Sequence, residues 1–287
     1  MKLKTGLNLL SLSIKALKRI NKPKEEKSLT FWEHLEELRS VFIRTLIVLI
    51  VMMIAVFAFK TPVFNFVLAP CNNDFFLYRG LSKLLIWMHL DPLPVFNLRL
   101  VNIEVASQFF VHLRVSAMIA LVISAPIILF MLWSFVAPAL YEKEKNAVKG
   151  AFGFASVLFY LGVAFGYCFI FPLTIRFLGS YQVSEIVTNT ISLSSYISMF
   201  IALILIMGLV FEMPVLVKIL NKLHLLPKSL LKKYRRHAFV GLLILAAVIT
   251  PTGDLFTLSV VTFPLYFLYE FSIAICKYDS PPDEDLF

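Results

Sequence analysis

Long uncharged stretches constrain this chain more than any other feature of its sequence. Several runs of more than 18 residues contain one charged residue or none, which is enough for a helix to cross a bilayer core of about 30 Å. Of the 287 residues, 59% are hydrophobic and only 16% are charged. Average soluble proteins have roughly 45–50% apolar and about 25% charged residues. A transmembrane barrel would show short alternating segments instead. The sequence therefore predicts an all-α integral membrane protein.

The apolar runs predict six transmembrane helices and a simple domain organisation. The expected spans are residues 41–59, 115–140, 150–175, 194–217, 238–250 and 255–276. We expect the last two helices to be short. The span 238–250 has only 13 residues, which at 1.5 Å each reach about 20 Å. A basic N-terminal tether (1–29) precedes the six-span domain (30–277), and an acidic tail (278–287) follows it. The long connection 61–108 would join the first two spans.

Lysine and arginine are distributed unevenly between the two sides of these spans. If the N-terminus is cytoplasmic, 21 of the 27 basic residues fall in cytoplasmic segments, as the positive-inside rule requires. The sequence thus predicts that both termini are cytoplasmic. This distribution also explains the net charge of +9 as an orientation signal, so nucleic acid is not expected as a partner.

The sequence lacks the usual motifs of several other function classes. Its three cysteines are widely spaced and suggest neither a metal site nor a disulfide framework. No His-Glu-x-x-His, Gly-x-Ser-x-Gly or phosphate-binding Gly-x-x-x-x-Gly-Lys motif occurs. We therefore expect no cofactor, no metal and no enzymatic activity. A secondary transporter or channel for a small solute remains the alternative function, although such proteins tend to show internal repeats.

An acidic segment stands directly before the first span. Residues 30–39 contain Glu33, Glu36 and Glu37 in a region that is otherwise basic. One interpretation is a solvated helix end with pairs such as Glu36 and Arg39. The other is a receptor surface, because a carboxylate can bind a guanidinium group in bidentate fashion. The predicted orientation places Glu142 and Glu144 on this same cytoplasmic side.

Glu212 is the strongest candidate for a functional residue inside the membrane. An ionisable group in an apolar run costs several kcal/mol unless it is paired or hydrated. Pro214 removes a backbone hydrogen bond nearby. The alternatives are a protonated carboxyl bonded to a neighbouring helix and a polar point that meets a partner. Asp254 could equally be a helix cap, and Glu270 could lie near the inner interface.

The chain resembles a known family over about residues 28–277: TatC, the multispanning subunit of the twin-arginine protein translocase. The segments that carry the resemblance occur in order around the predicted spans. They are His-Leu-Glu-Glu-Leu-Arg (34–39), Ala-Pro (69–70), Ser-Ala-Pro (124–126), Trp-Ser-Phe-Val-Ala-Pro-Ala-Leu-Tyr-Glu-Lys-Glu (133–144), Phe-Pro (171–172), Phe-Glu-Met-Pro (211–214), Thr-Pro-Thr-Gly-Asp (250–254) and Pro-Leu-Tyr (264–266) with Glu270.

The resemblance implies a receptor in the bacterial cytoplasmic (inner) membrane, folded as a concave bundle. Such proteins bind the Arg-Arg signal peptide of folded precursors at their cytoplasmic face. They then move the precursor with small single-span partners (TatA/TatB-like), driven by the protonmotive force. Membrane lipid and further copies of the same chain are the other expected partners.

The resemblance also assigns roles to residues. For signal-peptide binding it implies Glu37 and Glu144, with Phe135, Leu140 and Arg39 nearby. Inside the membrane it implies a polar or partner contact at Glu212 and Pro214. For partner contacts or structural turns it implies Pro70, Pro251, Asp254 and Glu270.

Overall fold

The computed structural model describes residues 31–278 except 97, 137–141, 183, 185–189 and 250–254. The chain divides into two compact units, residues 1–39 and 40–287. The first unit contributes the start of one helix to the described part, and the second unit contributes everything else. The predicted tether 1–29, the tail beyond residue 278, and Leu140, Pro251 and Asp254 lie outside the described residues.

The described part is almost entirely helical. Its helices are α2 (Phe31–Ala58), α3 (Lys60–Leu68), α4 (Phe76–Trp87), α5 (Ser107–Val136), α6 (Glu142–Phe165), α7 (Phe171–Ser180), α8 (Leu193–Val210), α9 (Met213–Lys222), α10 (Lys228–Lys233), α11 (Arg235–Ile249) and α12 (Leu255–Ile275). A 3-10 turn, η1 (Ala69–Cys71), and a π-helical turn, η3 (Gly166–Ile170), interrupt them. Two short strands, β1 (Leu100–Val101) and β2 (Ile191–Ser192), pair in parallel.

Five helical stretches of the described part are long and apolar enough to cross a membrane. They are His34–Ala58, Ser107–Phe135, Gly153–Ser180, Leu193–Lys222 and Leu255–Ile275. Helix α11 has 15 residues and is too short, at about 1.5 Å each, for a core of about 30 Å. The count of six spans stays a prediction. The expected shortness of the last helix is wrong, because α12 has 21 residues and is long enough to cross.

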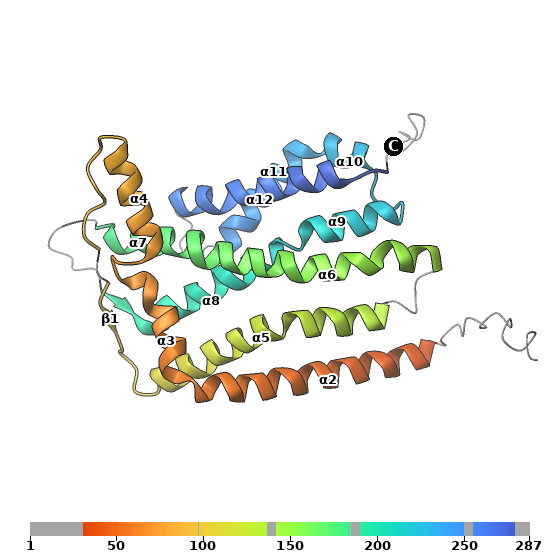
Figure 1. Cartoon of the computed structure of the whole chain (residues 1–287), viewed down its shortest axis with the longest axis horizontal. Helices are drawn as coiled ribbons and strands as arrows, with labels where there is room; N and C mark the ends of the chain where they lie inside the picture. Colours follow the sequence, from red (N-terminus) through yellow and green to blue (C-terminus); the bar gives the residue numbers. More distant parts are fainter. Residues whose placement is uncertain are drawn as a thin grey trace, which may run out of the picture. The chain divides into compact units, whose positions relative to one another are not determined.

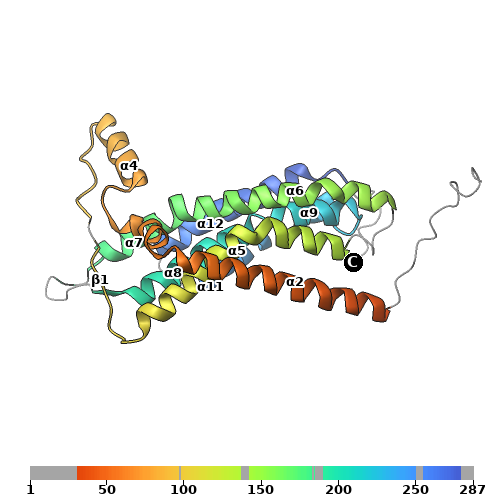
Figure 2. The same cartoon turned by 60° about the horizontal axis from the view of Figure 1, so that its bottom comes forward.

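Helix α8 lies at the centre of the hydrophobic core. Its side chains Tyr196, Ile197, Leu203 and Met207 are completely buried. The helix packs against α5, α6, α7 and α11, and Figures 1 and 2 show the long helices running beside one another in the larger unit. Its continuous apolar sequence, with no polar face, is typical of a helix surrounded by other helices. The core therefore forms around α8.

Prolines determine where the long helices are interrupted. Pro172 stands in the first turn of α7, directly after the π-helical turn η3. Pro214 stands in the first turn of α9, where residues Phe211 and Glu212 form a turn after α8. Proline lacks the amide hydrogen that would bond to the preceding turn, and a π-turn or a break relieves the conflict. Helix α5, in contrast, continues through Pro126.

Helices α6 and α8 come close together at two glycines. A Cβ atom built on Gly162 would lie 2.5 Å from the carbonyl oxygen of Met207 and 2.8 Å from Cβ of Phe211. A Cβ atom on Gly208 would lie 2.9 Å from the ring of Phe159. Small residues allow membrane helices to pack this closely. The contact brings α6 against the break between α8 and α9.

The connection between α2 and α5 is folded rather than extended. Helix α4 lies across one end of the long helices, near β1 and α7 (Figures 1 and 2). The hydroxyl of Tyr78 on α4 donates to the carbonyl oxygens of Pro172 (2.9 Å) and Pro70 (3.1 Å). Burial raises the pKa of this hydroxyl, so it stays a protonated donor. Tyr78 thereby fastens α4 to α7.

A buried amide fastens the end of α12 to the end of α9. The side-chain oxygen of Asn221 accepts from the backbone N–H groups of Lys277 and Tyr278, both at 3.0 Å. Its nitrogen donates to the carbonyl oxygens of Leu226 (2.8 Å) and Tyr278 (2.9 Å). Asn221 is 3% exposed, so this satisfied amide replaces water as the partner of four backbone groups.

Gly162→Ala is expected to destabilise the protein by about 1–3 kcal/mol, because the added methyl group overpacks the contact between α6 and α8. Thermal unfolding in detergent, followed with a thiol-reactive dye, measures this, since Cys71 and Cys276 are buried in the folded chain. Gly241→Ala is the matched control, because its Cβ would meet nothing within 4 Å and alanine is the better helix former. Equal unfolding temperatures for the two variants would contradict the close contact.

Asn221→Ala is expected to lower the free energy of unfolding by about 1–3 kcal/mol for each buried backbone group that is left without a partner. Hydrogen exchange at the amides of Lys277 and Tyr278 should accelerate, because both lose their acceptor. Asn65→Ala on α3, an exposed position, serves as the control and should leave the exchange of both amides unchanged. Unchanged exchange in Asn221→Ala would show that another group holds the end of α12.

Candidate functional site

The acidic segment forms the first turns of helix α2. Glu36 and Arg39 are exposed there, and Glu37 is half-buried. Leu35 and Leu38 are 41% and 44% exposed, so this part of the helix combines acid groups with uncovered apolar surface. The one ion pair between described residues lies elsewhere in the chain. The carboxylates of Glu36 and Glu37 are therefore available to a cationic ligand.

The second acidic pair begins helix α6. Glu142 and Glu144 belong to its first turn, where acid groups are favoured by the helix dipole; their side chains lie outside the described part. Phe135 is half-buried near the end of α5. The structure places Phe135 and Glu144 on either side of one short connection, as the sequence predicts for neighbours along the chain.

Glu212 occupies the break between α8 and α9. Its backbone carbonyl accepts from the N–H groups of Val215 and Leu216, both at 3.0 Å. The side-chain atom Oε1 is buried and has no hydrogen-bond partner among the described residues. Pro214, two residues on, is buried. A buried carboxyl oxygen without a partner is costly. The backbone of Phe159 on α6 interacts with the same carboxyl group.

Pro70 takes part in a structural contact of the first connection. Its carbonyl oxygen is one of the two acceptors of Tyr78. The guanidinium of Arg176 lies 4.8 Å from the centre of the Tyr78 ring and 5.3 Å from that of Phe96, a cation–π arrangement. Arg176 also donates to the carbonyl oxygen of Pro94. These contacts hold the connection against α7.

Glu270 pairs with an arginine of the preceding helix. Its Oε2 atom lies 2.7 Å from Nη2 of Arg235, and its Oε1 accepts from the hydroxyl of Tyr266 at 3.1 Å. Both side chains of the ion pair are partly exposed, so the pair contributes little to stability by itself. Its effect is to orient Arg235 between α11 and α12.

Sequence reasoning missed three of these contacts. The sequence assigned no role to Arg235, Tyr78 or Arg176. Arg176 and Glu270 are both charged residues at the edge of an apolar run, and this position could have indicated that each has a specific partner. Among the described residues, no group of three or more His, Cys, Asp or Glu side chains is placed to hold a metal ion.

Comparison with protein families gives a match over most of the chain. The family model for the Sec-independent protein translocase protein TatC matches residues 33–264. A relative from Blattabacterium sp. subsp. Periplaneta americana, the Sec-independent protein translocase protein TatC, is 37% identical over 89% of this chain and 98% of its own length. The protein of that name from Escherichia coli K12 is 30% identical over 85% and 87%.

Solved structures agree with this result. A crystal structure of the twin arginine translocase receptor TatC in DDM superposes with a TM-score of 0.69 at 28% identity, covering 85% of this chain and all of that one. A second crystal structure of the receptor has a TM-score of 0.67 at 27% identity. The helical fold, the spanning helices and the sequence matches agree, and this chain belongs to the TatC family of Sec-independent protein translocase subunits, which are multi-pass membrane proteins of the Tat system.

Proposed function

We propose that this protein is the receptor core of twin-arginine export in the bacterial cytoplasmic membrane. It binds the Arg-Arg signal peptide of a folded precursor at its cytoplasmic face. With small single-span TatA/TatB-like subunits, it then moves the precursor across the membrane, driven by the protonmotive force. Family membership supports this function, and both solved relatives are described as receptors.

The observation that carries the proposal is the available carboxylate of Glu37. It lies on a regular helix, in the first turn of an apolar stretch of 25 residues that begins at His34. A rigid helix keeps the carboxylate at the membrane surface without the entropic cost of ordering a loop. Uncovered apolar side chains beside it, Leu35 and Leu38, match the apolar residues that follow the arginines in a signal peptide.

Carboxylates select arginine over lysine by geometry. The planar guanidinium presents parallel N–H donors that two carboxylate oxygens accept together, whereas an ammonium group acts as a point charge. Glu37 and Glu144 would each bind one arginine of the pair. Arg39, exposed two residues after Glu37, would orient the Glu37 carboxylate and repel lysine-rich segments that lack the bidentate contact.

Glu37→Gln and Glu144→Gln are each expected to abolish binding of an Arg-Arg signal, because losing one partner of a desolvated ion contact costs about 2–5 kcal/mol. Photocrosslinking from position 38, beside Glu37, to a signal peptide in native membranes measures this. Crosslinks should form with the Arg-Arg peptide and not with its Lys-Lys version.

Glu36→Gln and Glu142→Gln are the matched controls, since each removes a neighbouring acid of the same helix turn. Both should retain crosslinking. If Arg-Arg and Lys-Lys peptides crosslink equally, or if the controls lose binding as the main variants do, the acidic segment is a solvated helix end and the receptor site lies elsewhere.

We propose in addition that Glu212 is the intramembrane point that meets the signal peptide or a partner helix. Glu212→Leu is expected to reduce export of a twin-arginine precursor at least tenfold, because the hydrogen-bond acceptor is lost. The same variant should unfold at an unchanged or higher temperature, since Oε1 of the native Glu212 has no hydrogen-bond partner among the described residues.

Export assays in membrane vesicles and thermal unfolding in detergent measure the two effects separately. Glu212→Gln, which keeps a hydrogen-bonding oxygen, should retain more export than Glu212→Leu. A Glu212→Leu protein that unfolds several degrees lower would contradict this role, because it would mean that the carboxyl serves mainly to stabilise the fold, through its interaction with the backbone of Phe159.

A further inference from the structure

The segment that joins α9 to α11 is strongly basic. From Lys218 to Arg236 the sequence has seven lysine and arginine residues and no aspartate or glutamate. Helix α10 and the C-terminal end of α12 lie at the same end of the larger unit (Figure 1). This end therefore presents concentrated positive charge at the level where a spanning helix leaves the bilayer. Such surfaces attract anionic lipid headgroups.

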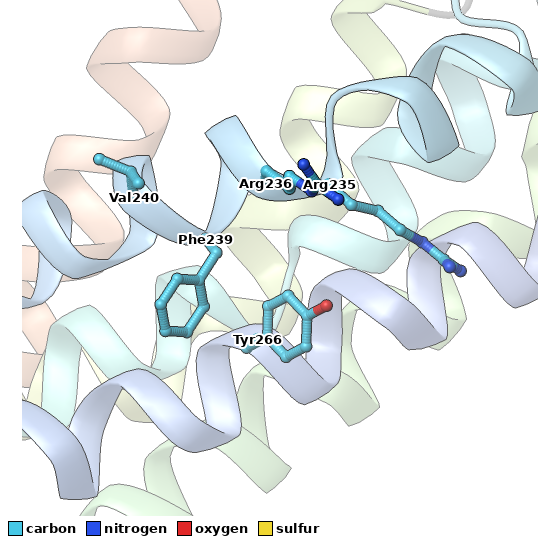
Figure 3. Close-up of a pocket in the computed structure, with 5 residues that line it drawn as sticks. All are labelled: Arg235, Arg236, Phe239, Val240 and Tyr266. Atoms are coloured by element: carbon cyan, nitrogen blue, oxygen red, sulfur yellow. The ribbon is translucent and has the colours of Figure 1, made fainter.

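A pocket opens at the inner edge of this basic segment. It has a volume of about 520 Å³ and is lined by Arg235, Arg236, Phe239, Val240 and Tyr266. Figure 3 shows the rings of Phe239 and Tyr266 next to each other, with both arginines above them on α11. The ring centroids are 5.5 Å apart at an interplanar angle of 88°. One side of the pocket is therefore cationic and the other is aromatic.

The two arginines differ in the interactions that their guanidinium groups make within the protein. Arg235 is tied to Glu270, which also accepts from Tyr266. Arg236 is exposed and has no ion pair or hydrogen bond with another described side chain. Glu270 thus holds one guanidinium in place and leaves the neighbouring guanidinium free. A phosphate placed above the rings can be bound by Arg236 and by the remaining donors of Arg235.

An apolar surface continues from the pocket toward the middle of the membrane. On α11, Val240, Ile244 and Val248 recur every fourth residue and are 54%, 61% and 79% exposed. Helix α12 runs antiparallel to α11, as the pairs Arg235–Glu270 and Phe239–Tyr266 require. Its Phe263 and Phe267 are 78% and 66% exposed. Acyl chains can cover this surface below a headgroup.

We propose that this pocket is a binding site for an anionic phospholipid. The lipid phosphate binds Arg236 and Arg235, the glycerol end lies against Phe239 and Tyr266, and the acyl chains follow the exposed faces of α11 and α12. The charge of the basic segment favours a lipid over an apolar helix, because a helix alone would leave Arg236 without an anion. The site is independent of the proposed signal-peptide site.

Lipid titration of the full-length protein in detergent tests the proposal, with native mass spectrometry to count bound lipids and thiol-dye unfolding to measure stabilisation. The probes are phosphatidylglycerol, phosphatidylcholine and inorganic phosphate. We expect saturable binding of phosphatidylglycerol with a rise in unfolding temperature. Phosphatidylcholine should bind at least tenfold more weakly, and phosphate should neither stabilise nor compete at millimolar concentration.

Arg236→Gln is expected to weaken phosphatidylglycerol binding about tenfold. The matched control is Lys233→Gln, which removes the same charge from an exposed position outside the pocket and should bind as the parent does. Arg236 makes no ion pair or hydrogen bond with another described side chain, so the variant should fold normally without lipid, and its unfolding temperature in plain detergent checks this.

Three results would overturn the proposal. Equal weakening by the two variants would show diffuse attraction to the whole basic segment. Equal binding of the two lipids would show an apolar surface suited to any lipid or to a partner helix. Competition by inorganic phosphate would show a simple anion site. Signal-peptide crosslinking is measured on the same Arg236→Gln protein. This distinguishes a loss of lipid binding from a loss of the proposed receptor function.

Discussion

Inside a bilayer, each backbone N–H and C=O group needs a partner within the protein, because no water is present to replace one. That constraint explains how this chain can interrupt its long helices. Pro172 is preceded by a π-helical turn, and Pro214 follows a turn at residues 211–212. A glycine allows a close helix contact at both interruptions: Gly166, in the π-helical turn, approaches Ile204 of α8, and Gly162 of α6 approaches Phe211. Breaks in the helices and close helix contacts therefore occur together.

The charged residues near the membrane segments are accommodated in different ways. Arg235 and Glu270 form an ion pair between α11 and α12. Arg176 lies over two aromatic rings and bonds to a backbone carbonyl. Glu212 lies in the turn between α8 and α9, and its Oε1 is buried without a hydrogen-bond partner among the described residues, as is Nη1 of Arg176. Since an unpaired buried polar atom is costly, stability alone does not explain the position of Glu212.

The proposed sites use opposite charges for related tasks. Carboxylates on α2 and α6 would bind the guanidinium groups of a signal peptide, and guanidinium groups on α11 would bind the phosphate of a lipid. Both rely on the bidentate geometry in which a guanidinium group donates two hydrogen bonds to the oxygens of one carboxylate or one phosphate. Because the basic residues between α9 and α11 would repel a cationic peptide, the acidic surface is the better place for an Arg-Arg motif to bind.

The sequence by itself determined the class of protein, the family and most of the spanning helices. Uncharged runs of this length are typical of membrane helices, which satisfy all their backbone hydrogen bonds internally. The motifs at residues 34–39, 133–144 and 211–214, which occur in the order typical of the family, indicated the family. Helix boundaries were less accurate: α5 begins at Ser107, ahead of the predicted residue 115, because apolarity alone does not show where a helix starts outside the membrane.

Only the tertiary structure decided which residues meet. The pairing of Arg235 with Glu270, the contact of Tyr78 with Pro70 and Pro172, and the amide of Asn221 at the end of α12 join positions between 8 and 94 residues apart. Periodicity and composition describe one segment at a time, whereas these contacts depend on how separate segments pack. For the same reason, the candidate carboxylates could be identified from the sequence, whereas the pocket between α11 and α12 could not. That pocket exists only because the two helices lie side by side.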